Sequence, residues 1–266
     1  MESLALKIIL TPILIGTASL AGRRWGPTVG GWLVALPLTS GPIIFFLALA
    51  HGSAFAAVTA AGTLAGAISQ AGFCVIYARL AAGRGWLSTL AASSLGFAAI
   101  TALLQRLTLA PLPLFLLALL ALALALRLMP HAGNTAAAPA IPPAWDIPGR
   151  MALATAAVLI LTGSAAALGP QLTGLLAPFP LYGTTLAIFA HRLEGPAQAS
   201  RVLRGLLMGL FSFAGFFLVL ASLLDRLALG AAFGASIGVA LTIQLVTLRI
   251  LTGDKDTDDE RPPRPG

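Results

Sequence analysis

The sequence predicts an all-α, polytopic membrane protein with nine transmembrane helices, built as two inverted four-helix repeats joined by a linker helix. Composition, an internal repeat and the placement of basic residues support this prediction. The chain has 266 residues, of which 58% are hydrophobic and 9% are charged. Soluble domains carry about 25% charged residues. The net charge of +7 comes from basic residues that stand mostly between apolar stretches, so we expect them to orient helices rather than bind nucleic acid.

The internal repeat pairs residues 26–73 with residues 169–216 without a gap, and 17 of the 48 positions are identical. Many of the matches are glycine or proline, such as Gly26-Pro27 with Gly169-Pro170. These residues fix the shape of the backbone, which a chance match of leucines would not do. One fold used twice in a membrane protein is typical of a transporter.

Nine apolar stretches approach or exceed the length of about 20 residues that crosses a bilayer. They are 4–22, 28–50, 54–78, 86–105, 111–129, 150–168, 171–191, 202–222 and 229–250. The first stretch is similar to a signal peptide, but the repeat aligns residues 7–27 with 150–170. We therefore expect it to be a retained transmembrane helix.

These spans divide the chain into five parts. They are a first repeat unit (1–107), a linker helix (108–130), a cytoplasmic Pro/Ala-rich loop (131–149), a second repeat unit (150–252) and a disordered charged tail (253–266). The apolar span of this linker, 111–129, contains no Gly, Ser, Thr or Gln. We expect it to face lipid and to return the chain across the membrane, so that the second unit inserts upside down.

The Lys and Arg residues predict the orientation. With the N-terminus outside, 13 of them fall in cytoplasmic segments and 3 on the other side. Because positive residues favour the cytoplasm, the sequence predicts a membrane protein with its N-terminus outside and its C-terminus in the cytoplasm. In this orientation the two repeat units enter from opposite sides.

Two predicted spans carry prolines near their centres, at matching places in the repeat. The residues concerned are Pro37, Thr39, Ser40, Gly41 and Pro42 in the second span and Pro178, Pro180, Tyr182 and Gly183 in the seventh. Proline removes a backbone donor and interrupts a helix, and the freed groups must be buried in protein or line a wet cavity. Paired breaks in two halves are typical of a transporter's binding site. The alternative interpretation is a pair of packed kinks.

Other polar and small residues complete the candidate set. Gly62 and Gly66, with Gly205 and Gly209 at the equivalent places, predict close helix packing, with a dimer interface as the alternative. Gln70 is a candidate for lining a cavity. His51 and His191, at span ends, are either interfacial caps or parts of a proton path.

The sequence offers few other residues that could bind a metal or cofactor or take part in catalysis. Cys74 is the only cysteine, and the sequence predicts no catalytic residue, no metal site and no cofactor. No Asp or Glu falls in the middle of a span, which disfavours an exchanger of organic cations for protons. An enzyme would need a cluster of His, Asp, Glu or Cys. The three His and the few acidic residues of this sequence do not cluster, which disfavours an enzyme.

The second half resembles the GlpM family of small bacterial inner-membrane proteins. The resemblance is carried by residues 174–180 (GLLAPFP), 186–191 (LAIFAH) and 220–227 (LASLLDRL) and covers about 171–245. The first half is similar more weakly and lacks the counterparts of His191 and Asp225-Arg226. Because such proteins are about one four-helix unit long, the resemblance implies that this chain is a fused pair. It also implies that the membrane is the bacterial inner membrane.

The leading hypothesis is a secondary transporter or facilitator for a small anionic or polar solute. Its predicted site lies between the discontinuous second and seventh helices. The alternative is a non-transporting accessory or structural inner-membrane protein, for example one that supports envelope polysaccharide production. The lipid bilayer is the expected partner, and the sequence indicates no particular oligomeric state.

Overall fold

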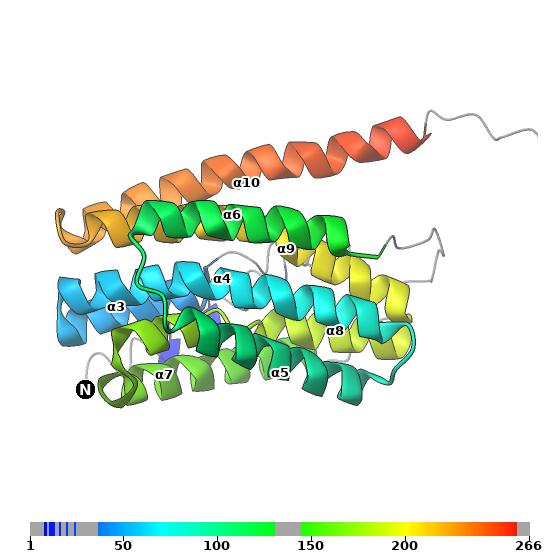
Figure 1. Cartoon of the computed structure of the whole chain (residues 1–266), viewed down its shortest axis with the longest axis horizontal. Coiled ribbons are helices and arrows are strands. Elements are labelled where there is room, and N and C mark those ends of the chain that lie inside the picture. Colours follow the sequence, from blue (N-terminus) through cyan, green and yellow to red (C-terminus); the bar gives the residue numbers. More distant parts are fainter. Residues whose placement is uncertain are drawn as a thin grey trace, which may run out of the picture.

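The structure, a computed structural model, describes residues 37–130 and 145–259 and, among the first 24, residues 8, 9, 11–13, 16, 20 and 24. The described residues form helices and no strand. The helices are α3 (Ser40–His51), α4 (Ser53–Ala81), α5 (Trp86–Leu104), α6 (Pro111–Leu128), α7 (Asp146–Leu176), α8 (Leu181–Leu193), α9 (Pro196–Leu223) and α10 (Leu229–Asp259). They lie side by side as one elongated bundle (Figure 1).

Within the described residues, six helical stretches are long and apolar enough to cross a membrane. They are 53–81, 86–104, 111–128, 158–176, 196–223 and 229–247. α3 is apolar but has only 12 residues. Predicted span 4–22 and the first part of predicted span 28–50 fall largely outside the described residues. The number nine therefore stays a prediction. The described residues confirm a helical fold with several helices long and apolar enough to span a membrane.

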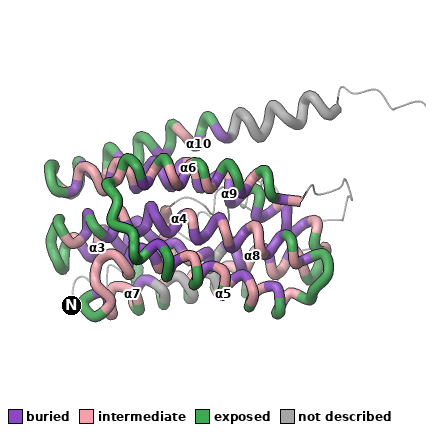
Figure 2. The backbone as a smooth tube through the Cα atoms, in the orientation of Figure 1, coloured by how far each residue is buried: buried purple, intermediate pink, exposed green. Residues whose placement is uncertain are grey.

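α4 and α9 form the centre of the bundle. They pack against each other, and most of their residues are buried (Figure 2). α5 and α7 cover α4, α8 and α10 cover α9, and α6 lies across both. The chain passes along α4 and α9 in opposite directions (Figure 1).

α6 buries a single narrow stripe. Leu114, Ala118, Leu122 and Ala125 are buried. Between them Leu116, Leu120 and Leu124 are exposed, with Leu120 at 66%. One buried stripe is what an amphipathic contact on a bundle requires. The remaining leucines of this Leu/Ala helix suit a lipid surface.

The helix bounds follow the sequence repeat closely. α4 and α9 begin at Ser53 and Pro196, and α5 and α10 begin at Trp86 and Leu229, in both cases 143 residues apart. The glycines before α4 and α9 also share one backbone conformation, with φ 89° and ψ 170° at Gly52 and φ 94° and ψ 175° at Gly195. Only glycine adopts this region readily.

The boundary predicted between the spans 150–168 and 171–191 is present, because Gly169 is non-helical (φ 75°, ψ 166°) and α7 consists of two helical parts that meet there. The second part ends at Leu176, before the shorter helix α8. Pro170 follows the kink, which explains it because proline cannot continue a helix without strain at the preceding residue. α7 already begins within the predicted loop 131–149, of which residues 131–144 lie outside the described part.

α10 continues to Asp259 and so includes part of the segment predicted as a disordered tail. Residues 260–266 lie outside the described part of the chain. Arg79, on α4, donates from Nε to the carbonyl oxygen of Leu128 at 2.9 Å. That bond satisfies one of the last carbonyls of α6, which have no partner within the helix.

Candidate functional site

The break in the second half separates α7 from α8. α7 ends at Leu176, and residues 177–180 form a turn and an irregular segment before α8 begins. Pro178 and Pro180 have no backbone N–H, so no helical bond can continue through them. Phe179 N donates to the carbonyl oxygen of Leu176 at 3.0 Å, which closes the turn.

The break in the first half lies where α3 begins. Pro37, Leu38 and Thr39 form a bend and turn, and α3 starts at Ser40. Gly41 N donates to the carbonyl oxygen of Pro37 at 2.8 Å. Thr39 occupies the N-cap position, but its side chain makes no capping bond.

The two breaks meet in space. Ser40 Oγ donates to the carbonyl oxygen of Ala177 at 3.0 Å. Ser40 is 3% exposed and Ala177 is 6% exposed, so the bond is buried. It joins residues 137 positions apart, one from each half. A carbonyl that the end of α7 leaves without a helical donor is therefore satisfied by the first residue of α3.

α4 packs against the second break through glycines. A Cβ built on Gly66 would lie 2.8 Å from the carbonyl oxygen of Leu175 and would overlap the ring of Pro178. A Cβ on Gly62 would lie 2.6 Å from the carbonyl oxygen of Gln171. The backbones of α4 and the end of α7 therefore approach as closely as they do because these positions have no side chain.

Aromatic rings hold the second break from another side. Phe179 lies 5.1 Å from Phe97 and 6.1 Å from Phe73, measured between ring centroids, with the ring planes at 89° and 73°. These edge-to-face arrangements are favourable for aromatic pairs. Phe97 comes from α5 and Phe73 from α4, so the irregular segment is fixed against both helices.

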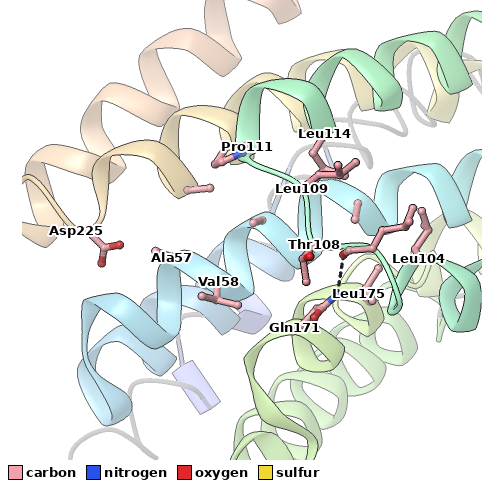
Figure 3. Close-up of a pocket in the computed structure, with 15 residues that line it drawn as sticks. Ala57, Val58, Leu104, Thr108, Leu109, Pro111, Leu114, Gln171, Leu175 and Asp225 are labelled. Atoms are coloured by element: carbon pink, nitrogen blue, oxygen red, sulfur yellow. Dashed lines mark hydrogen bonds between the residues drawn. The ribbon is translucent and has the colours of Figure 1, made fainter.

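A cavity of about 460 Å³ opens near the α5–α6 connection and the end of α9 (Figure 3). Its walls are mostly apolar, and they include Gly62, Ala65 and Leu175 close to the second break. Asp225 stands at one edge of the cavity (Figure 3). Gln171 Nε2 donates to the carbonyl oxygens of Gln105 and Leu107, at 3.0 and 3.1 Å.

A second cavity of about 390 Å³ lies beside the first break. Its lining residues are Pro37, Leu38, Gly41, Pro42, Phe45, Phe216, Phe233, Ile237, Ala240 and Leu241. All of these are apolar or glycine. Neither of the two cavities is lined by residues from both breaks.

The other candidate residues are spread around the breaks. Gln70 lies on α4, one helical turn beyond Gly66, and is buried. Gly183 faces α9, because a Cβ there would lie 2.6 Å from Cδ2 of Leu206. Gly205 and Gly209 are buried in α9. Tyr182 lies in the first turn of α8, and its side chain is outside the described part.

Sequence reasoning missed Ala177, Phe179 and Gly174. An alanine whose contribution is its carbonyl oxygen gives no signal in a sequence. Gly174 did give one, because it matches Gly31 in the repeat. In the structure, a side chain at Gly174 would point at the backbone of α4, towards Thr59, Gly62 and Thr63.

The described residues include no group of three or more His, Cys, Asp or Glu that could hold a metal ion. The long apolar helices make the chain an integral membrane protein with several spans. No protein-family model, no curated protein and no solved structure matches the chain. The resemblance to the GlpM family therefore stays a prediction.

Proposed function

We propose that this chain is a secondary transporter or facilitator of the bacterial inner membrane, with a site for a small anionic or polar solute between its two helix breaks. The hydrogen bond from Ser40 to Ala177 carries the proposal. Backbone groups that leave a helix within a membrane have to be buried in protein or wetted. Here both interrupted segments come to one place, which is the arrangement of transporters with discontinuous helices.

An inverted repeat is part of the proposal. Its support is the common helix bounds, the matching conformations of Gly52 and Gly195 and the opposite directions of α4 and α9. The N-terminus outside, the nine spans and a fused pair of GlpM-like units complete it. In such a structure α3 and α8 are half-helices, and their N-terminal ends attract negative or polar groups.

The cavity beside Leu175 supplies an approach to the site from one membrane face. Its lining includes Gly62, and α4 and the end of α7 are in close contact at Gly62 and Gly66. We interpret this arrangement as a state open to one side and closed at the breaks.

A non-transporting accessory protein is the second candidate. It is favoured by the tight packing of Gly66 on Pro178, and by the fact that neither of the two cavities reaches both breaks. In that case the breaks are packed kinks, and the cavity beside Leu175 is a surface feature of the bundle.

Uptake into proteoliposomes distinguishes the two candidates. We expect the wild-type protein to move at least one member of a panel of small anions and uncharged polar solutes faster than protein-free liposomes do. We expect Ser40→Ala to lower that rate about tenfold, since losing about 1.4 kcal/mol at the site changes an equilibrium by that factor. A hydrogen bond of this kind, with the buried carbonyl then left unpaired, is worth about 1–3 kcal/mol.

Ser222→Ala is the matched control, because Ser222 Oγ bonds only the carbonyl oxygen of Leu218 in its own helix. Its uptake rate should equal that of the wild type. A well-folded wild-type protein that moves no solute in the panel would support the accessory function instead.

A further inference from the structure

The second cavity, of about 390 Å³, has purely apolar walls. One wall comes from the first break and α3, and the others come from Phe216 of α9 and from four residues of α10. No hydroxyl, amide or charged side chain is among its lining residues. Its volume lies within the range of small-molecule sites, about 300–1,000 Å³.

The sequence repeat explains why a cavity lies at this place. At the second break, the ring of Phe179 packs edge-to-face on Phe97 of α5 and Phe73 of α4. The repeat pairs Phe73 with Phe216 and Phe97 with Ala240, and both Phe216 and Ala240 line the second cavity. Each break thus lies against the two corresponding helices of the other half. The first break meets an alanine where the second break meets a ring, so space is left there.

Three phenylalanine rings keep this space from collapsing. The ring of Phe233 lies 5.5 Å from that of Phe45 and 6.0 Å from that of Phe216, with the ring planes at 90° and 72°. These edge-to-face pairs hold the rings in place. α3 packs on α4 and α7, whereas α3 and α10 are not among the closely packed helix pairs. The two helices are therefore bridged by rings at one side of the cavity rather than by close backbone contact.

The cavity is continuous with the lipid-facing surface of α10. Ile237 and Leu241 line the cavity and are also 49% and 53% exposed. They lie near the middle of the stretch 229–247, which is long and apolar enough to cross a membrane. The middle of such a stretch lies in the hydrocarbon core of the bilayer. The mouth of the cavity therefore faces lipid tails and not water.

The chemistry of the walls decides what the cavity holds. A buried water needs several polar partners, and none of the lining side chains offers one. An empty cavity would leave the lining atoms without contacts on one side, which forfeits dispersion energy. Lipid tails are as apolar as the walls, so a tail enters without losing hydrogen bonds and restores those contacts.

We propose that the second cavity binds one acyl chain of a membrane phospholipid, which enters past Ile237 and Leu241. The chain fills the place that the ring of Phe97 fills at the second break. Its methylene groups pack against Phe216 and against Pro37 and Gly41 of the first break, so that the lipid supports this break from the side of α10. The inference depends only on the cavity and the bilayer, and it holds whether or not the protein moves a solute.

Photolabelling of the wild-type protein tests the proposal. The probe is a phosphatidylcholine with a photoreactive diazirine near the middle of one acyl chain, mixed into proteoliposomes, and mass spectrometry of peptides locates the adducts. We expect adducts at Phe216, although it is only 2% exposed, as well as at the exposed Leu120 of α6. Phe73 is the equivalent of Phe216 in the repeat, is fully buried and lines neither of the two cavities. It should stay unlabelled.

Ala240→Phe fills the cavity with the residue that the other half has at this position. Labelling at Phe216 should then fall to the level at Phe73, while labelling at Leu120 stays unchanged. Ala235→Phe is the matched control, because Ala235 lies on the same helix, is exposed and does not line the cavity. It should leave the labelling of Phe216 as in the wild type.

The wild-type result decides the question even if Ala240→Phe does not fold. A protein that is labelled at Leu120 but not at Phe216 would overturn the proposal. Absence of adducts at Ile237 and Leu241 as well would show that a second copy of the chain covers this face instead of lipid. Equal labelling of Phe216 in the wild type and in folded Ala240→Phe would contradict the assignment of the acyl chain to this cavity.

Discussion

Replacing Gly174 by alanine should lower the free energy of unfolding by about 3 kcal/mol, at the upper end of what overpacking a core costs. The added Cβ would lie 2.9 Å from both the α-carbon of Gly62 and the backbone nitrogen of Thr63, and would overlap the carbonyl oxygen of Thr59. All three obstacles are backbone atoms of α4. No side chain can rotate away, so the helices themselves have to separate.

Gly163→Ala is the control for this variant, since Gly163 lies on the same helix and an added Cβ there would have no neighbour within 4 Å. It should leave stability unchanged or raise it by about 1 kcal/mol, the helix preference of alanine over glycine. Reversible unfolding in mixed detergent micelles measures both variants. Equal stabilities would show that α4 and α7 do not cross at Gly174.

Replacing Phe179 by alanine should cost about 3 kcal/mol of unfolding free energy, the lower end of the range for Phe→Ala in a core, because the ring is only partly buried. The variant loses the contacts with Phe73 and Phe97. Because Phe179 anchors the irregular segment between α7 and α8, we also expect the uptake rate to fall. Thermal unfolding in detergent and proteoliposome uptake measure the two effects.

Phe179→Leu separates lost volume from lost ring geometry. It keeps most of the volume and should cost under about 1.5 kcal/mol. Leu95→Ala serves as the baseline, since Leu95 is 71% exposed and touches little protein. If Phe179→Ala proves as mild as Leu95→Ala, the aromatic cluster does not hold the break.

The helical bundle and its repeat could be predicted from the sequence, because both depend on patterns of neighbouring residues. Apolar stretches about 20 residues long define membrane helices. The matching glycines define where α4 and α9 begin, at Gly52 and Gly195. The prolines at 178 and 180 likewise marked the place where α7 gives way to α8.

The contacts between the halves could not be predicted, because they depend on atoms that every residue carries. Ser40 was a candidate for its hydroxyl, but its partner is the backbone oxygen of Ala177. The break at Gly169 could be predicted, in contrast, since Gly-Pro was interpreted as a helix end and Gly169 is non-helical.

Buried polar side chains show the same limit in another form. Gln70 was a candidate because amides are rare in membrane helices, but Thr184 gave no comparable signal. Hydroxyls in membrane helices often bond the carbonyl one turn earlier, as Thr63 does with Thr59 at 2.9 Å. Thr184 is informative only because the structure leaves its Oγ1 without such a bond.

Cross-linking between the two breaks tests the central claim most directly. In a Cys74→Ala background, the Ser40→Cys/Ala177→Cys protein should form an intramolecular disulfide when membranes are oxidised, because the hydrogen-bonded residues are neighbours. The Ser40→Cys/Ala125→Cys protein is the control, with both residues buried but α3 and α6 not closely packed. Cross-linking of the first pair alone is the predicted result. Failure of the first pair in a folded protein, or equal cross-linking of both, would contradict the meeting of the breaks.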